Sequence, residues 1–295
     1  MLKGRLGLET ARIPQADRQG LLWLGRGVLA VEDGTLHFRT AGNGRLPAGD
    51  FAIPFQMVNA ILLEPGTTVS HDALRLMSRH GTGLIAVSED GTRFYASMPF
   101  GPDASALARR QARAWADEQG ERLRVARRMY AWRFGEVLPE EDITVLRGIE
   151  GARMRELYRR LAEQFDIPWQ GRHYDRNDPE SNDPVNQAIN HAASAVEGAA
   201  QVAVAVCGAI PQLGFIHEES GNAFPLDVSD LFRAAITLPA AFSAVRECRA
   251  DPRVPLERAV RRAAGRMLRE REIIPEMIER IKELFARADD GGGHP

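Results

Sequence analysis

The sequence predicts an α+β protein, with a small β-rich domain at residues 1–97 followed by a larger all-helical domain at residues 98–288. Two segments, RGVLAVEDGTLHFRT and GLIAVSEDGTRFYAS, place an Asp-Gly pair between short runs of β-forming residues, a pattern typical of β-hairpins. Beyond Pro102, long stretches repeat apolar residues at helical spacing. The 295 residues, 44% hydrophobic and 26% charged, suffice for two folded domains.

Further elements of the first half follow from short local signals. The segments DFAIPF and NAILLEP have the composition of strands. After them, SHDALRLMSRHG predicts one helix, because Ser70 is suited to cap its start and Gly81 to end it. The second hairpin then closes this domain.

The second half reads as a series of helices. One helix is expected over SALARRQARAWADEQGERLRVARRMYAWRFGE and the next over EDITVLRGIEGARMRELYRRLAEQF, before a polar loop from Gly171 to Asp183. A helix over DPVNQAINHAASAVEGAAQVAVAVCG begins with Asp183 as N-cap and Pro184 at its first position. Its later half is apolar nearly all round, which predicts a buried central helix. Two or three shorter helices and a frayed tail at residues 289–295 complete the chain.

Composition excludes several classes of protein. The two cysteines, Cys207 and Cys248, lie in apolar helical contexts, which argues against a disulfide scaffold or a cysteine zinc site and fits a reducing cytoplasm. No export signal is recognisable, and the longest apolar stretch, GAAQVAVAVCGAI, is too short to span a membrane. We therefore expect a cytoplasmic protein without membrane contact.

Charge is distributed unevenly along the chain. The net charge is −2, but almost all basic residues are arginine, with Lys3 and Lys282 the only lysines, and guanidinium groups suit bidentate phosphate contacts. The segment from Arg258 to Arg271 has six arginines and one acid, a local charge of +5. At helical spacing one face carries Arg258, Arg262, Arg266 and Arg269. This stripe predicts contact with DNA phosphates; an ordinary solvated helix face is the alternative.

Glu150 interrupts an apolar helical stripe. The stripe consists of Leu146, Met154, Leu157, Leu161 and Phe165. Glu150 holds the position between Leu146 and Met154, which places a carboxylate on the buried face. Flanking Gly148 and Gly151 weaken a helix by up to about 1 kcal/mol each, so we expect a close backbone approach there. A metal ion would compensate for the buried charge; alternatively, Glu150 reaches solvent or pairs with an arginine.

The segment GFIHEESGNAFPLDVSD contains a second set of candidate ligands. Asp227 and Asp230 lie at i and i+3, on one side of a helical turn, and His217 can approach them from the preceding loop. Two carboxylates of this set, a third from Glu150 and one imidazole would suit Mg²⁺ or Mn²⁺. The structural alternatives are Asp227 as a helix N-cap, with Asp230 completing a capping box, and His217 as a core histidine bonded to a carbonyl.

Seven segments, taken together in order and spacing, resemble one known family. They are EPGTTVSHDALRL, DGTRFYAS, RFGE, LRGIEG, DPVNQAI, GFIH and DVSDLF. The chain is similar to the CRISPR-associated adaptation integrase, the first of the numbered CRISPR-associated proteins, in its type I-E form. The resemblance implies a β-rich N-terminal domain, a helical catalytic domain and a divalent metal held by Glu150, His217 and Asp230. It also implies that Asp227 lies beside the metal as an auxiliary acid.

The same resemblance implies a reaction and partners. A 3′-hydroxyl of a captured DNA duplex would attack a phosphodiester of a CRISPR repeat, and water in its place would give endonuclease activity. A homodimer formed through the β-rich half would bind double-stranded DNA, with two dimers bridged by a dimer of a small ferredoxin-like companion. Arg93, in DGTRFYAS, is expected to contact DNA. Glu197 and Ser220 depart from family-typical residues, which puts DNA contacts at those two positions in doubt.

Two other functions remain open on the sequence alone. The first is a metal-dependent repair nuclease acting on branched DNA, which would shorten strands without joining them. The second is a non-catalytic DNA-binding scaffold, in which Glu150, His217 and Asp230 make only structural hydrogen bonds. Reaction products and the effect of metal distinguish the three functions.

Overall fold

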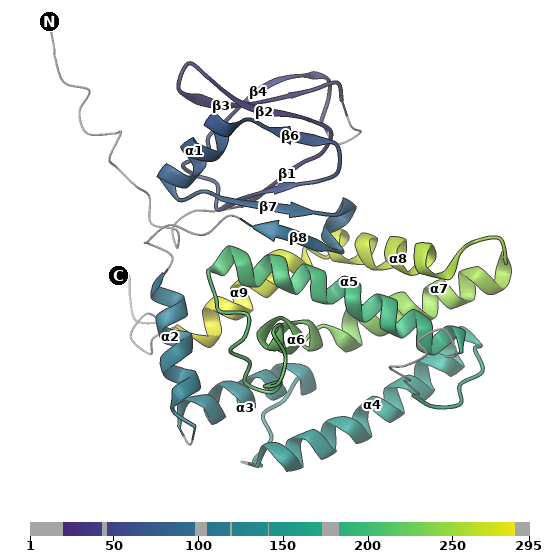
Figure 1. Cartoon of the computed structure of the whole chain (residues 1–295). Helices are drawn as coiled ribbons and strands as arrows, with labels where there is room; N and C mark the ends of the chain where they lie inside the picture. Colours follow the sequence, from purple (N-terminus) through teal and green to yellow (C-terminus); the bar gives the residue numbers. More distant parts are fainter. Residues whose placement is uncertain are drawn as a thin grey trace, which may run out of the picture. The chain divides into compact units, whose positions relative to one another are not determined.

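A computed structural model describes residues 20–42, 46–97, 105–118, 120–140, 142–172 and 183–286. The chain forms two compact units: the first holds the described residues of Met1–Ser88 and Tyr95–Ala106, the second those of Glu89–Phe94 and Leu107–Pro295. Strands are confined to the N-terminal part and long helices to the rest, which confirms the predicted α+β class (Figure 1). The expected tail and most of the expected polar loop lie outside the described residues.

The first unit contains two four-stranded sheets. One has the strand order β1-β5-β7-β8 and the other β4-β3-β2-β6. The strands are β1 (Leu21–Leu24), β2 (Gly27–Glu32), β3 (Thr35–Thr40), β4 (Gly49–Ile53), β5 (Ala60–Leu63), β6 (Thr67–Val69), β7 (Gly83–Val87) and β8 (Phe94–Ser97). In the first sheet β1, β5 and β7 run parallel. The short strands β1 and β6 were not expected from the sequence, because neither shows a run of alternating residues.

Local signals in this unit correspond closely to the observed elements. β2 and β3 pair antiparallel with Glu32 opposite Thr35, and Asp33 and Gly34 between them have φ values of 49° and 77°. This is the tight turn predicted from the first Asp-Gly pair. Helix α1 (His71–His80) begins at Ser70, whose side chain accepts a hydrogen bond from the amide of Ala73, and ends at a left-handed Gly81. Both caps are confirmed.

The second Asp-Gly pair does not form the predicted tight hairpin. β7 and β8 are neighbours in the sheet, but residues 88–93 connect them, with Asp90 and Gly91 in a short 3-10 turn, η2 (Glu89–Gly91). This segment packs in the helical unit against α5 (Pro184–Cys207) and α8 (Leu256–Glu270). Two glycines leave room for this segment. A Cβ on Gly198 would lie 2.6 Å from the Thr92 carbonyl oxygen, and a Cβ on Gly265 would lie 2.9 Å from the Asp90 Cβ. Tertiary packing therefore overrides the local turn signal.

The second unit is helical. Its remaining elements are α2 (Ser105–Ala116), α3 (Glu121–Phe134), α4 (Ile143–Phe165), α6 (Ala223–Asp230), the π-helix η5 (Arg233–Thr237), α7 (Leu238–Ala250) and α9 (Ile273–Leu284). The single helix predicted from Ser105 to Glu136 is wrong, because it breaks between α2 and α3. Gly120 has non-helical φ and ψ of −109° and −95°, and the Asp117 carboxylate accepts hydrogen bonds from the amides of Gly120 and Glu121.

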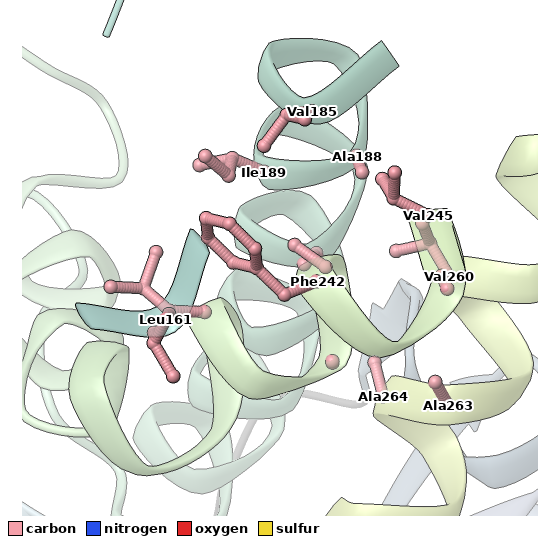
Figure 2. Close-up of a cluster of buried hydrophobic side chains, with 14 of the residues drawn as sticks. Leu161, Val185, Ala188, Ile189, Phe242, Val245, Val260, Ala263 and Ala264 are labelled. Carbon is pink, nitrogen blue, oxygen red and sulfur yellow. The ribbon is translucent and has the colours of Figure 1, made fainter. Parts of the chain in front are cut away.

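Helix α5 is the centre of this unit, as predicted from its apolar surface. Asp183 accepts hydrogen bonds from the amides of Val185 and Asn186, and Pro184 occupies the first turn. Helices α6, α7, α8 and α9 pack around α5 (Figure 1). Figure 2 shows part of the resulting core, which joins Leu161 of α4 to Val185, Ala188 and Ile189 of α5, Phe242 and Val245 of α7, and Val260, Ala263 and Ala264 of α8.

More helices follow α5 than the two or three that were expected. The described chain has α6, η5, α7, α8 and α9 in this part. Cys207 and Cys248 are both free thiols, and burial raises the pKa of the Cys207 thiol to about 12. Among the described residues no single helix is both long and apolar enough to cross a membrane. One pair bent by 64°, Ala223–Asp230 with Arg233–Ala250, meets that test on length and composition only.

Candidate active site

Three helices and one loop of the helical unit enclose a pocket of about 740 Å³. The loop is the connection between α5 and α6. The lining residues are Tyr130 and Arg133 from α3, Arg147 and Glu150 from α4, Ile216, His217, Glu218, Glu219 and Ser220 from the loop, and Leu226 and Asp230 from α6. Glu150, His217 and Asp230, the three predicted metal ligands, thus line the same pocket although they are far apart in the sequence.

Glu150 reaches the pocket from the apolar face of α4. Leu146, one turn earlier, is buried, and the Glu150 side chain is only 18% exposed. The carboxylate is paired, because Arg133 Nη2 donates a hydrogen bond to Glu150 Oε1. No part of the described chain makes the close backbone approach expected at the flanking glycines: a Cβ at Gly148 would meet nothing within 4 Å, and one at Gly151 only the end of a flexible arginine.

His217 is presented by a tight loop that follows α5. Gly214 lies within this loop, and a Cβ there would lie 2.2 Å from the His217 carbonyl oxygen, so only glycine fits. Arg147 donates a hydrogen bond to the Ile216 carbonyl oxygen at 2.8 Å and so ties the loop to α4. The His217 side chain is 40% exposed and bonded to a carboxylate, which excludes the alternative of a core histidine bonded to a carbonyl.

Asp227 is the fully buried anchor of this loop. Its carboxylate accepts hydrogen bonds from the amides of Phe215, Ile216 and His217 at 2.5, 3.0 and 2.9 Å. The predicted N-cap and capping box are wrong, because α6 begins at Ala223 and Asp227 lies inside it. The prediction assumed that the helix begins after Pro225. Pro225 instead lies in the first turn of α6, where a backbone N–H has no helical partner to lose.

The same carboxylate orients the imidazole. His217 Nδ1 lies 2.7 Å from Asp227 Oδ1, and because a carboxylate only accepts, Nδ1 carries the hydrogen. His217 Nε2 is left facing Asp230 Oδ2 at 3.9 Å. Carboxylates commonly hold metal-binding histidines in this way, so that the opposite ring nitrogen is available as a ligand. The hydrogen bond to Asp227 raises the pKa of His217, while partial burial opposes it.

Two arginines surround Asp230. Arg133 Nη2 lies 3.4 Å from Asp230 Oδ2, and its side chain is only 6% exposed. Arg233 Nη1 lies 3.3 Å from the other oxygen, Oδ1, and its Nη2 donates to the Tyr158 hydroxyl at 3.0 Å. Burial lowers the pKa of Arg133, while the charge of Asp230 counteracts it. The candidate ligands are therefore embedded in a network of charged side chains, of which Arg133 and Asp227 are buried and the others partly exposed.

Comparison with known proteins identifies the family to which this chain belongs. The profile of the family described as CRISPR associated protein Cas1 matches residues 21–135 and 131–253. The CRISPR-associated endonuclease Cas1 of Escherichia coli strain K12 is 36% identical over 280 residues, covering 94% of this chain and 88% of that protein. The chain belongs to the CRISPR associated protein Cas1 family.

Solved structures agree with membership of the Cas1 family. The crystal structure of a TtCas1-DNA complex has a TM-score of 0.81 at 35% identity, covering 91% of this chain and 97% of that chain. A casposase bound to integration product shares the fold, with a TM-score of 0.65 at 16% identity, covering 90% of this chain and 96% of that chain.

In this Cas1 chain the pocket contains two residues, Arg133 and Arg147, that contact the candidate ligands or their loop and that sequence reasoning missed. Arg133 contacts both candidate carboxylate ligands, and Arg147 holds the loop of His217. Arg133 begins the RFGE segment and Arg147 lies in LRGIEG, two of the segments that carried the family resemblance. Their presence in those motifs was the available signal. Their roles depend on partners in other helices, which residue periodicity does not indicate.

A second Glu/His/Asp group lies in the first unit. Glu32, His37 and Asp50 have ligand atoms all within 4.8 Å of one another and could hold a metal ion; no other such group of three occurs among the described residues. Arg39 already pairs with Glu32 and lies 3.9 Å from Asp50, so these carboxylates have a cation. The ligand atoms of Glu150, His217 and Asp230 are more widely spaced, and the Arg133 guanidinium bonds to both carboxylates.

The arginines predicted to contact DNA are all exposed, but only some lack an acidic partner. Arg262 pairs with Glu247, Arg269 with Asp90, and Arg93 with Glu257 at 2.9 Å. Arg258 and Arg266 have no acidic partner within the part of the chain that the structure describes. The predicted face of α8 is thus solvent-exposed, with two arginines available for an external anion.

Proposed function

We propose that this chain is the metal-dependent DNA integrase of CRISPR adaptation, in a type I-E system, with an accompanying DNA endonuclease activity. The observation that carries the proposal is the meeting of Glu150, His217 and Asp230 in one pocket, with Asp227 holding His217 from behind. The Cas1 relatives named as endonucleases and the DNA complex of TtCas1 support action on DNA.

The donor set of the pocket fits a hard divalent cation such as Mg²⁺ or Mn²⁺. Glu150 and Asp230 offer carboxylate oxygens, and His217 offers Nε2 because its Nδ1 is engaged by Asp227. Four carboxylates and two arginines line the pocket, and Arg122 and Arg233 pair with two of those carboxylates, Glu218 and Asp230. A divalent cation between Glu150 and Asp230 would favour the approach of a DNA phosphate. Glu150, His217 and Asp230 are therefore the residues that would hold the metal.

The proposed reaction is a transesterification at phosphorus. The oxygen of a 3′-hydroxyl on the captured DNA forms a bond to a repeat phosphorus, and the bond from that phosphorus to the repeat's own 3′-oxygen breaks. The proton of the attacking hydroxyl is lost and the departing oxygen gains one, so no covalent protein intermediate is required. A bound divalent cation would supply acidification of the attacking hydroxyl and neutralisation of charge on the phosphoryl oxygens.

The residues of this chain position the reaction. Asp227 fixes the ring of His217 and three amides of its loop, and Arg147 fixes the Ile216 carbonyl, so the loop is held from both sides. Asp227 is fully buried, so we propose that it acts through His217 and replaces the auxiliary acid role that the resemblance implied. Exposed arginines of α8, foremost Arg258 and Arg266, would bind duplex phosphates without reading bases.

Strand-joining assays test this function. A labelled short duplex is incubated with a plasmid carrying a CRISPR repeat, the protein, its companion and Mg²⁺ or Mn²⁺. Glu150→Ala, His217→Ala and Asp230→Ala should each abolish joining while duplex affinity stays nearly unchanged, and chelation should reproduce that loss. Glu163→Ala, on the exposed face of the same helix α4, is the matched control and should join DNA normally.

The products separate the rival functions. Joined strands support integration, whereas shortened strands without joined ones would support a branched-DNA repair nuclease. If Glu150→Ala joined DNA at the normal rate with metal present, the catalytic function would be refuted and a non-catalytic scaffold would remain. A double variant of two ligands should be scarcely worse than either single variant, because both remove the same site.

A further inference from the structure

The Arg133 guanidinium joins the two carboxylates of the proposed metal site. Its Nη2 donates to Glu150 Oε1 and lies 3.4 Å from Asp230 Oδ2. The side chain is 6% exposed, and its Cζ lies 5.6 Å from the centre of the Tyr130 ring. Arg133 is therefore a buried cation, bonded to one oxygen of each of the two carboxylates that would hold a divalent cation.

Electrostatics explains why a cation is needed there. Two carboxylates that share a partly buried pocket repel each other, and an uncompensated buried charge is strongly unfavourable. In the metal-free protein Arg133 compensates both. A divalent cation would do the same, but the two cannot occupy one place, because ligand oxygens surround a bound ion at about 2.0–2.6 Å.

Other arginines at the pocket do not share this geometry. Arg233 approaches Asp230 from its other oxygen, Oδ1, and is also bonded to the Tyr158 hydroxyl. Arg147 is bonded to the backbone carbonyl of Ile216. Only Arg133, among the residues that line the pocket, contacts both Glu150 and Asp230.

We propose that Arg133 is a built-in competitor of the metal, which stabilises the metal-free pocket and sets how tightly the divalent cation binds. This inference rests on the proposed function, since it assumes that Glu150 and Asp230 are metal ligands. Metal binding then requires the Arg133 guanidinium to release at least one carboxylate. The protein exchanges an internal cation for an external one, so metal affinity is weaker than the three ligands alone would confer.

Calorimetric titration of the metal-free full chain with Mn²⁺ tests the proposal. Arg133→Gln removes the competing charge and should tighten the Mn²⁺ dissociation constant by roughly ten- to a hundredfold, the range over which neighbouring groups alter metal affinity. Arg133→Lys, which keeps the charge but loses the planar fork, should lie between wild type and Arg133→Gln. In thermal melts with chelator, Arg133→Gln should have a lower melting temperature than wild type. Mn²⁺ should raise the melting temperature of Arg133→Gln by more than it raises that of wild type.

Arg233→Gln is the matched control, because it removes the same charge from the same aspartate without opening the space between the carboxylates. It should tighten Mn²⁺ binding much less than Arg133→Gln. If both variants tightened Mn²⁺ binding equally, the effect would come from the loss of any nearby positive charge, and the proposal would be overturned. Unchanged or weaker Mn²⁺ binding by a folded Arg133→Gln would overturn it too. If Arg133→Gln did not fold, Arg133→Lys decides: no tightening relative to wild type overturns the proposal.

A separate variant distinguishes this inference from the proposed function. Glu150→Gln removes a ligand charge and should weaken Mn²⁺ binding at least tenfold if the metal site is correct. If Glu150→Gln weakened Mn²⁺ binding while Arg133→Gln did not tighten it, the metal site would be supported and the competing role of Arg133 would be refuted. Unaltered binding in Glu150→Gln would refute the metal site itself.

Discussion

Asp227 and His217 are joined twice, through the backbone amide at 2.9 Å and through ring Nδ1 at 2.7 Å, both to the same Asp227 oxygen. A single buried carboxylate thus fixes the position of the histidine backbone and the direction of its ring. The other oxygen holds the two preceding amides. Asp227 therefore contributes both to the stability of the loop and to the orientation of the proposed ligand.

Replacing Asp227 should affect stability more than loss of a helix cap would. Asp227→Ala leaves three backbone N–H groups without an acceptor, at about 1–3 kcal/mol for each buried group, so we expect a loss of roughly 3 kcal/mol or more. Urea unfolding measures this loss. Glu219→Gln, at an exposed position of the same loop, leaves those amides bonded and should cost far less. A loss near 1 kcal/mol, that of an ordinary cap, would contradict the anchoring role.

The Asp227 carboxylate should also make stability depend on pH in the metal-free protein. It raises the folded-state pKa of His217 above the usual 6.5. The stabilisation by charged His217 is thus fully present below about pH 6.5 and is lost as pH rises through the raised pKa. The difference in unfolding free energy between wild type and His217→Gln should shrink over that window. Ring resonances in NMR give the pKa directly; a value below 6.5 would contradict the prediction.

Gly214 should tolerate no side chain. A Cβ there would lie 2.2 Å from the His217 carbonyl oxygen and 2.8 Å from the Ala223 Cβ, so Gly214→Ala must displace the loop or α6. Overpacking of this kind costs about 1–3 kcal/mol, and strand joining should fall because His217 moves. Gly221→Ala is the control from the same loop, since a Cβ there meets nothing within 4 Å. Equal stability of both variants in urea would show that the turn is not tight.

Arginines of α8 should differ in their contribution to DNA binding. Replacing Arg258, Arg262, Arg266 and Arg269 together should weaken duplex binding regardless of sequence. Arg258→Gln with Arg266→Gln should reduce the salt slope by about 1.8, at roughly 0.9 for each lost phosphate contact. Arg262→Gln with Arg269→Gln should reduce it less, because Glu247 and Asp90 already engage those two. Binding titrations over a salt series measure the slopes; an unchanged slope in the quadruple variant would leave α8 as an ordinary solvated face.

Assembly should follow the proposed adaptation complex. We predict that the purified chain forms homodimers through its β-rich half and that a small ferredoxin-like companion dimer bridges two of them. Light scattering or native mass measurement should give a dimer alone and a hexamer with the companion. A strict monomer at micromolar concentration that ignores the companion would contradict this prediction.

Signals confined to a few residues allowed accurate prediction from the sequence. Ser70 and Gly81 bound α1, Asp183 and Pro184 start α5, and Asp33 forms the first hairpin turn. In each case the deciding hydrogen bond or backbone angle lies within one turn of chain, so neighbouring residues contain the whole cause. The place of Glu150 on the inner face of α4 belongs with these, because it needs only the helical period.

Contacts between distant segments were decided by the tertiary structure. Asp227 resembled a cap because Pro225 precedes it, yet its partners are the amides of residues 215–217. Arg133 meets Glu150 and Asp230 only because α3, α4 and α6 converge on one pocket. Charge pairing and desolvation depend on distance in space, and sequence spacing does not encode that distance for groups on separate helices. The sequence by itself therefore predicted which residues could bind a metal, and the tertiary structure placed a buried arginine against two of them.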